Sequence, residues 1–142
     1  MKAPVGVILA GGLASRMGGG DKGLLPLGDS TILGHVVDRL SPQVSRLALN
    51  ANGDPARFAA LGLPVLPDSV EGYAGPLAGV LAGLDWAAGE GASHLVTAAA
   101  DTPFFPGDLV PRLIAAAEDQ GKPIALARTA NGRHPTFCLW PV

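Results

Sequence analysis

A stretch near the N-terminus combines many glycines with two basic residues, and this composition suits the binding of an anion. The stretch runs from Gly11 to about Leu24 and directly follows an apolar run. Because glycine has no Cβ, its backbone N–H groups can approach phosphate oxygens closely. Arg16 can bind two phosphate oxygens at once, and Lys22 adds a compact charge. We interpret the stretch as a polyphosphate-binding loop, with a plain surface loop as the alternative.

Two familiar glycine motifs do not explain this loop. A Walker A loop needs Gly-Lys followed by Ser or Thr, whereas Lys22 stands between Asp21 and Gly23. Residues 18–23 satisfy G-x-G-x-x-G, but this match begins well after the apolar run ends. A dinucleotide fingerprint begins in the tight turn itself, so a NAD-dependent enzyme is disfavoured.

Three further polar residues follow apolar runs at points where strands would end. Asp101 precedes Thr-Pro, and a carboxylate there can bind Mg²⁺, which takes one or two carboxylates with waters and substrate phosphates. Its spacing from Pro106 is too long for a direct helix cap. Asp68 can be a nucleotide ligand or a turn aspartate. Asn50 can bind a base or ribose, or simply end a strand.

The segment from Gly75 to Gly79, Gly-Pro-Leu-Ala-Gly, enters a predicted helix. Its glycines would let a flat base lie close to backbone groups that can read its edge. The alternative is close helix packing through small residues. His134, at a turn, is interpreted as structural, and Cys138, in an apolar strand, as a buried hydrophobe.

These residues need a scaffold, and the chain alternates apolar runs with helical patterns, which is typical of a parallel sheet with crossover helices. Strands are predicted at Val5–Ala10, Arg46–Asn50, Leu63–Leu66, His94–Ala99, Ile124–Arg128 and Pro135–Leu139, the last two joined through Asn131-Gly132. Helices are predicted at Thr31–Leu40 with Ser30 as N-cap, from Asp54-Pro55 to Gly62, from Pro76 to Ala88, and from Pro106 to just before Gly121. The expected fold is α/β, with three layers, a mostly parallel Rossmann-like sheet and helices on both faces. In such sheets ligands bind at the carboxyl ends of the strands, where the polar residues above would gather.

Composition narrows the class of protein. The 142 residues are 48% hydrophobic and 15% charged, which predicts one globular domain spanning residues 1–142. The net charge of −2 and the absence of a basic run disfavour nucleic acid. No apolar run approaches the roughly 18 residues of a membrane span. One cysteine fits a reducing cytoplasm, and Gly11-Gly12 interrupts the apolar stretch that would otherwise imitate a secretory signal.

Taken in order, the motifs resemble the signature of molybdenum cofactor guanylyltransferases, within the nucleotidyltransferase superfamily. The matching segments are Leu9-Ala-Gly-Gly12, Arg16-Met-Gly-Gly19, Asp21-Lys-Gly-Leu24, Asn50-Ala-Asn52, Asp68-Ser69, Gly75-Pro-Leu-Ala-Gly79, Asp101-Thr-Pro103 and His134-Pro-Thr136. They cover essentially the whole chain, and the resemblance implies the fold of nucleotide-diphospho-sugar transferases.

The resemblance also implies an activity: transfer of GMP from GTP to the terminal phosphate of molybdopterin, with release of pyrophosphate and dependence on Mg²⁺. The residues expected to contact GTP or its metal are Leu9, Ala10, Gly11, Gly12, Lys22, Asn50, Asp68 and Asp101, with Asp101 as the metal ligand. Gly75, Pro76, Leu77 and Gly79 are expected near the guanine. Arg16, Lys22 and Asp101 are the residues expected to act in catalysis. Other proteins of molybdenum cofactor biosynthesis are further expected partners.

Alternatives remain at this level. A cytidylyltransferase for the same cofactor or a sugar-phosphate nucleotidyltransferase would share most motifs, and a nucleotide-binding scaffold without activity would share them too. The family pattern continues past the His-Pro strand with an acceptor-binding segment, which these 142 residues do not include.

Overall fold

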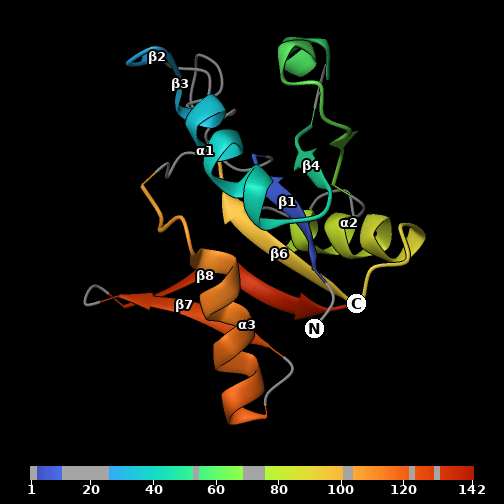
Figure 1. Cartoon of the computed structure of the whole chain (residues 1–142). Helices are drawn as coiled ribbons and strands as arrows, with labels where there is room; N and C mark the ends of the chain where they lie inside the picture. The colour runs from blue at the N-terminus through green and yellow to red at the C-terminus, as the bar shows by residue number, and fades with distance from the viewer. Residues whose placement is uncertain are drawn as a thin grey trace.

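A six-stranded sheet lies at the centre of the computed structural model, which describes residues 3–10, 26–52, 55–68, 76–100, 104–121, 124–129 and 132–142. The strand order is β5-β4-β1-β6-β8-β7 (Figure 1). The first four strands are parallel: β5 (Val65–Leu66), β4 (Leu47–Asn50), β1 (Val5–Leu9) and β6 (His94–Ala99). The last two, β8 (Gly132–Pro141) and β7 (Ala125–Thr129), pair antiparallel. The prediction of a mostly parallel sheet is confirmed.

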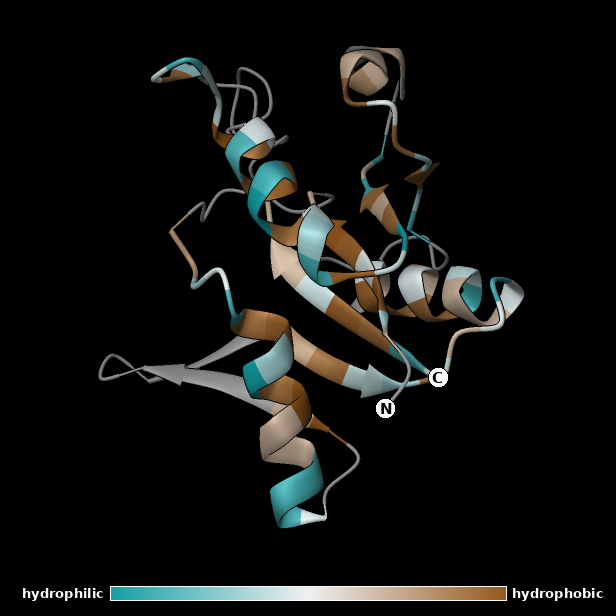
Figure 2. Ribbon diagram, viewed as in Figure 1, coloured by the Kyte–Doolittle hydropathy of each residue, from teal (hydrophilic) through white to brown (hydrophobic). Residues whose placement is uncertain are grey.

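Helices cover both faces of this sheet. Helix α2 (Pro76–Gly89) packs on one face, and α1 (Ile32–Leu40) and α3 (Leu109–Gln120) pack on the other (Figure 1). Side chains alternate along a strand, so Val5 and Val7 join the α2 cluster whereas Ile8 joins the cluster under α1 and α3. The central strands are therefore apolar on both faces, as their colouring shows (Figure 2). The predicted three-layer arrangement is confirmed.

Helix α2 lies unusually close to the sheet because of its glycines. A Cβ at Gly83 would come within 3.1 Å of Val7 Cγ2 and 3.1 Å of Leu95 Cδ2, which is tighter than ordinary van der Waals contact. The missing side chain thus lets the helix backbone approach β1 and β6. A larger residue at this position would push the helix away from the sheet.

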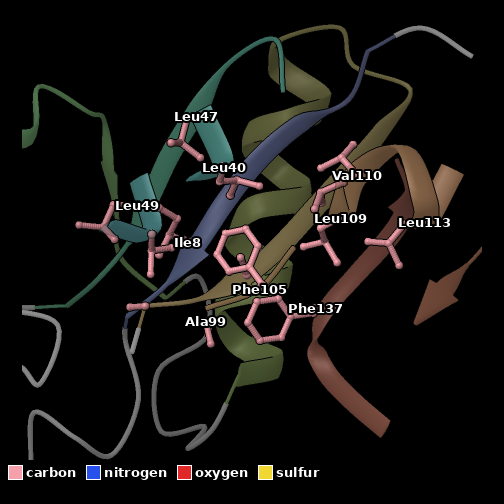
Figure 3. Packing of buried hydrophobic residues seen from close by; sticks show 14 of the residues in the cluster. Ile8, Leu40, Leu47, Leu49, Ala99, Phe105, Leu109, Val110, Leu113 and Phe137 are labelled. Carbon is pink, nitrogen blue, oxygen red and sulfur yellow. The ribbon is translucent and has the colours of Figure 1, made fainter. Parts of the chain in front are cut away.

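The opposite face is closed by an aromatic pair and by side chains of α1 and α3. The rings of Phe105 and Phe137 lie with centroids 5.5 Å apart, beside Leu109 and Leu113 (Figure 3). Cys138 is buried and free, as predicted, and burial raises the pKa of its thiol to about 11. This cysteine therefore behaves as a core residue and not as a nucleophile.

A hydrogen bond between two side chains joins β6 to β8. Trp140 Nε1 donates to Thr97 Oγ1 over 3.1 Å, across the β6–β8 pair. Thr97 is fully buried, so this bond satisfies a hydroxyl that would otherwise lack a partner.

The predicted elements are present, but several ends differ: β5 begins at Val65 and not at Leu63, β8 spans Gly132–Pro141 and not Pro135–Leu139, and α3 begins at Leu109, beyond Pro106. Three further differences concern a cap, a helix type and a hairpin. The N-cap of α1 is Thr31 and not Ser30: Thr31 Oγ1 accepts from Gly34 N over 2.9 Å. The segment after Pro55 is a 3₁₀ helix, η4 (Pro55–Leu61), and a short one, η3 (Ser41–Gln43), follows α1. An unpredicted hairpin, β2 (Pro26–Leu27) with β3 (Ser30–Thr31), precedes α1.

At two of the three glycines where a helix was predicted to end, the described chain has a left-handed glycine. Gly62 has φ +67° after η4, and Gly121 has φ +60° and donates to Ala117 O and Glu118 O at the end of α3. Helix α2 includes Gly89, and the chain turns at Gly91, where φ is +72°. In the described part of the chain, none of the helices is both long and apolar enough to cross a membrane.

The cap assignment gives a direct test. We expect Thr31→Ala to lower the free energy of unfolding by about 1 kcal/mol, because Gly34 N loses its acceptor. Urea denaturation measures this, and Ser30→Ala is the matched control, with a smaller expected loss. A larger loss for Ser30→Ala would restore the cap that the sequence predicted.

Candidate functional site

Four neighbouring strands end in one row. Leu9 is in register with Asn50 of β4 on one side and with Ala99 of β6 on the other, and Asn50 is in register with Leu66 of β5. Because all four strands are parallel, these residues lie at the same carboxyl edge. Asn50, and the chain just before Asp68, are therefore brought to one edge, as the sequence analysis predicted for these two candidates.

Hydrogen bonds extend the ladder one residue past the strands. Ala10 N donates to Asn50 O over 2.8 Å, and Ala100 N donates to Leu9 O over 3.1 Å. The residue before the glycine-rich loop and the residue before Asp101 are thus tied to adjacent backbones. These two residues, Ala10 and Ala100, follow neighbouring strands.

Asn50 is buried at this edge, and both hydrogens of its side-chain amide are donated within the protein. Only 2% of its surface is exposed. Its Nδ2 donates to Leu66 O over 3.1 Å and to the carboxylate oxygen Oδ1 of Asp68 over 2.9 Å. A buried amide with two donor hydrogens needs two acceptors; the last residue of β5 supplies one and the loop after β5 supplies the other. Asn50 therefore links the end of β4 to Asp68.

Asp68 is held from a second direction by Asn52. Asn52 Nδ2 donates to Asp68 Oδ2 over 2.9 Å, and Asp68 N donates to Asn52 Oδ1 over 2.8 Å. Each carboxylate oxygen thus accepts from a neutral amide and keeps a second lone pair. The carboxylate is fixed in direction without a partner cation among these contacts. It can accept hydrogen bonds from a ligand hydroxyl or N–H.

Asn52 is the residue whose role the sequence reasoning missed. It appeared only as part of a matched segment, although its spacing of two from Asn50 was visible. Its contact with Asp68 spans 16 residues, and only the alignment of β4 with β5 brings the two together.

Gly79 lies where α2 passes over the strand ends. A Cβ there would overlap the side-chain oxygen of Asn50 and lie 3.0 Å from Leu9 Cδ2. The absence of a side chain at Gly79 thus allows Asn50 to occupy its place under the helix. This geometry supports the packing interpretation for Gly79, and its expected proximity to guanine stays a prediction.

The other candidates divide between described and undescribed parts of the chain. Pro76 and Leu77 form the first turn of α2. Gly11, Gly12, Arg16, Lys22, Gly75 and Asp101 lie outside the described residues. Within the described ranges, no group of three or more His, Cys, Asp or Glu side chains is arranged to hold a metal ion. The predicted roles of all these residues stay predictions.

Comparisons with known proteins agree with this geometry. A sequence model described as the MobA-like NTP transferase domain matches residues 6–142. A protein from Mesorhizobium japonicum named molybdenum cofactor guanylyltransferase is 61% identical over 137 residues, which are 96% of this chain and 66% of that protein. The chain thus spans just under two thirds of this relative's length.

Solved structures share the fold. The homologue of Mycobacterium tuberculosis Rv0371c from Mycobacterium sp. strain JC1 is 28% identical, with a TM-score of 0.73 over 96% of this chain and 69% of that one. Rv0371c from M. tuberculosis H37Rv, in a complex with manganese, is 24% identical, with a TM-score of 0.67 over 99% of this chain and 72% of that one.

The family model matches the chain from β1 to its last residue. The relative from M. japonicum carries the family name that the motifs led us to expect. This chain belongs to the MobA-like NTP transferase family.

Proposed function

We propose that this protein transfers GMP from GTP to the terminal phosphate of molybdopterin and releases pyrophosphate. The observation that carries the proposal is the row of strand ends formed by Leu66, Asn50, Leu9 and Ala99. It brings Ala10, which precedes the glycine-rich loop, the fixed Asp68 carboxylate and the residue before Asp101 to one edge of the sheet. A nucleoside triphosphate needs this combination of a phosphate loop, an acceptor for hydroxyls and a metal ligand.

Asp101 is the residue that we propose to hold Mg²⁺. Such a site needs only one or two protein carboxylates, with waters and substrate phosphates as the other ligands. The hydrogen bond from Ala100 N to Leu9 O supports this role, because it ties the chain just before Asp101 to the strand that leads into the phosphate loop. When bound, the ion supplies positive charge against the triphosphate.

The chain's own part in the reaction is positioning and charge stabilisation. The acceptor phosphate attacks the α-phosphorus in line, and the bond to pyrophosphate breaks. Lys22 and Arg16 offset charge on the α-phosphate and on the leaving pyrophosphate. A phosphate monoester is already ionised near neutral pH, since its second pKa is about 6, so no general base is needed.

Asp68 serves nucleotide binding in this proposal. Its carboxylate keeps lone pairs that can accept from the ribose hydroxyls, and Asn50 and Asn52 fix its direction. Asn50 itself acts through Asp68, because both of its amide hydrogens are used within the protein. The segment from Gly75 to Gly79 is proposed to lie near guanine. The single cysteine supports a reducing, cytoplasmic location.

Thermal unfolding with GTP, CTP or ATP, each with and without Mg²⁺, tests the proposal. A ligand at 100 times its Kd stabilises by about 2.7 kcal/mol, and each kcal/mol raises Tm by roughly 2–8 °C. We expect a magnesium-enhanced rise with GTP alone. A rise with CTP alone would indicate a cytidylyltransferase, and no rise with any nucleotide would contradict nucleotide transfer.

Two substitutions separate the phosphate role from the metal role. Lys22→Ala removes a cation, so we expect weaker GTP binding both with and without Mg²⁺. Asp101→Asn removes a metal ligand, so we expect loss of the magnesium enhancement with little change in the Tm of the free protein. Titrations followed by thermal shift measure both. Unchanged GTP affinity in the first variant, or unchanged magnesium dependence in the second, would refute that residue's role.

Asn52→Ala tests whether the direction of Asp68 matters. The variant removes both contacts of Asn52 with Asp68, so we expect GTP affinity to fall about tenfold, equivalent to about 1.4 kcal/mol. Gln120→Ala, at the exposed end of α3, is the matched control. If a folded Asn52→Ala protein binds GTP as the wild type does, Asp68 does not need this support.

A further inference from the structure

A cavity of about 620 Å³ lies beside α1. Its described lining residues are Leu27, Gly28, His35, Asp38, Arg39, Pro42, Phe104 and Gly107. They come from the β2–β3 hairpin, from α1 and its end, and from the segment that leads from β6 to α3. The volume lies within the range of about 300–1,000 Å³ that is typical of small-molecule sites.

The wall formed by residues 104–107 is held in place by α1 and η3. Arg39 Nη1 donates to Phe105 O over 2.9 Å, and Gln43 Nε2 donates to Pro106 O over 3.4 Å. Val110 N donates to Gln43 Oε1 over 2.8 Å at the start of α3. The ring of Phe105 is buried against Phe137 (Figure 3). This wall is therefore shaped before any ligand arrives, which lowers the entropy cost of binding.

The opposite wall, the hairpin, is also tied to α1. His35 Nε2 lies 2.6 Å from Leu27 O and donates to it, because a carbonyl oxygen can only accept. Both walls of the cavity are thus anchored to the same helix.

Phe104 stands on this fixed wall with its ring exposed. It is 80% exposed, the highest value among the exposed large hydrophobic residues of the described ranges. The ring of the neighbouring Phe105 is buried, so a hydrophobic core lies next to this segment. The ring of Phe104 is exposed although that core is close by. An aromatic ring held at the rim of a cavity offers a stacking surface to a flat ring.

The polar residues of the lining indicate which kind of flat ring would bind. Asp38 forms no ion pair within the part of the chain that the structure describes, so its carboxylate can accept from a ligand. A 2-amino-4-oxopyrimidine edge has two parallel N–H donors that match a carboxylate. Arg39 adds positive charge to the same lining and suits a ligand that is anionic elsewhere.

The cavity is close along the chain to the residue proposed to hold the metal ion. Phe104 follows Asp101 by three residues, so consecutive Cα spacings of about 3.8 Å limit the distance between their Cα atoms to about 11 Å. A pterin with its pyrimidine edge in the cavity and its phosphate at its other end could reach toward Asp101.

We propose that the cavity beside α1 binds the pterin ring of the acceptor, with Phe104 stacking on the ring and Asp38 accepting from its 2-amino-4-oxo edge. This inference rests on the proposed function, which names a pterin as acceptor, and adds where that acceptor is held. It places part of the acceptor site on α1 and on the segment after Asp101.

The test is an NMR titration of the ¹⁵N-labelled chain with 6-hydroxymethylpterin, in the presence of GTP and Mg²⁺. Saturating nucleotide is needed because a pterin shares its edge with guanine and could enter the guanine site. We expect shifts in the amide signals of Gly28, Asp38 and Gly107. We also expect pterin to bind more tightly than lumazine, which carries an oxo group in place of the 2-amino group.

Two variants and two matched controls locate the contacts. Phe104→Ala should raise the Kd for the pterin at least about tenfold. Asp38→Asn should reduce the preference for pterin over lumazine by about tenfold. Leu81→Ala and Asp85→Asn change an exposed apolar and an exposed acidic residue on α2, and should leave both values unchanged.

The outcomes are distinct. No pterin-induced shifts up to millimolar concentration, shifts confined to Asn50 and Gly79, or wild-type binding by both variants would each overturn the inference. If GTP still raises Tm in that case, the proposed function stands and only the cavity's role fails. If GTP gives no rise, the proposed function fails by itself, whatever the pterin does.

Discussion

The parallel pairing of β1 with strands on both of its sides is the constraint on which the site depends. Its backbone groups are shared between β4 and β6, and the ladder continues through Ala10 and Ala100 beyond the strand ends. A buried strand cannot leave N–H or C=O groups unpaired without a large cost. The positions of Ala10 and Ala100, which precede the glycine-rich loop and Asp101 in the chain, are therefore fixed by the same bonds that hold the sheet together.

Packing on the α2 face reaches the same edge. Gly83 brings the helix against β1 and β6, and Gly79 leaves room for Asn50 at the strand end. Asn50 is one of two buried polar side chains in the described core, and its amide contacts hold Asp68. The packing of α2 and the direction of the Asp68 carboxylate are thus coupled, because a shift of α2 would disturb the Asn50 amide that holds this carboxylate.

Strong periodic patterns were sufficient to predict the elements. The strand His94–Ala99 was predicted with its observed ends because its apolar run lies between Ser93-His94 and Asp101. Very short strands, and the choice between two adjacent capping residues, were harder to predict. The β2–β3 hairpin has two residues in each strand, too few for any period, and the cap of α1 depends on which of two adjacent hydroxyls, Ser30 or Thr31, faces Gly34 N.

By itself the sequence determined the fold class, the order along the chain of the six strands of the main sheet, and the residue types that follow them, since apolar periodicity and glycine or proline signals act locally. Only the tertiary structure decided how those residues meet. Asp68 contacts Asn50 across 18 residues, and Arg39 contacts Phe105 across 66. Such contacts follow from strand register and helix placement, which arise from packing the whole sheet and have no signature in any single stretch of the chain.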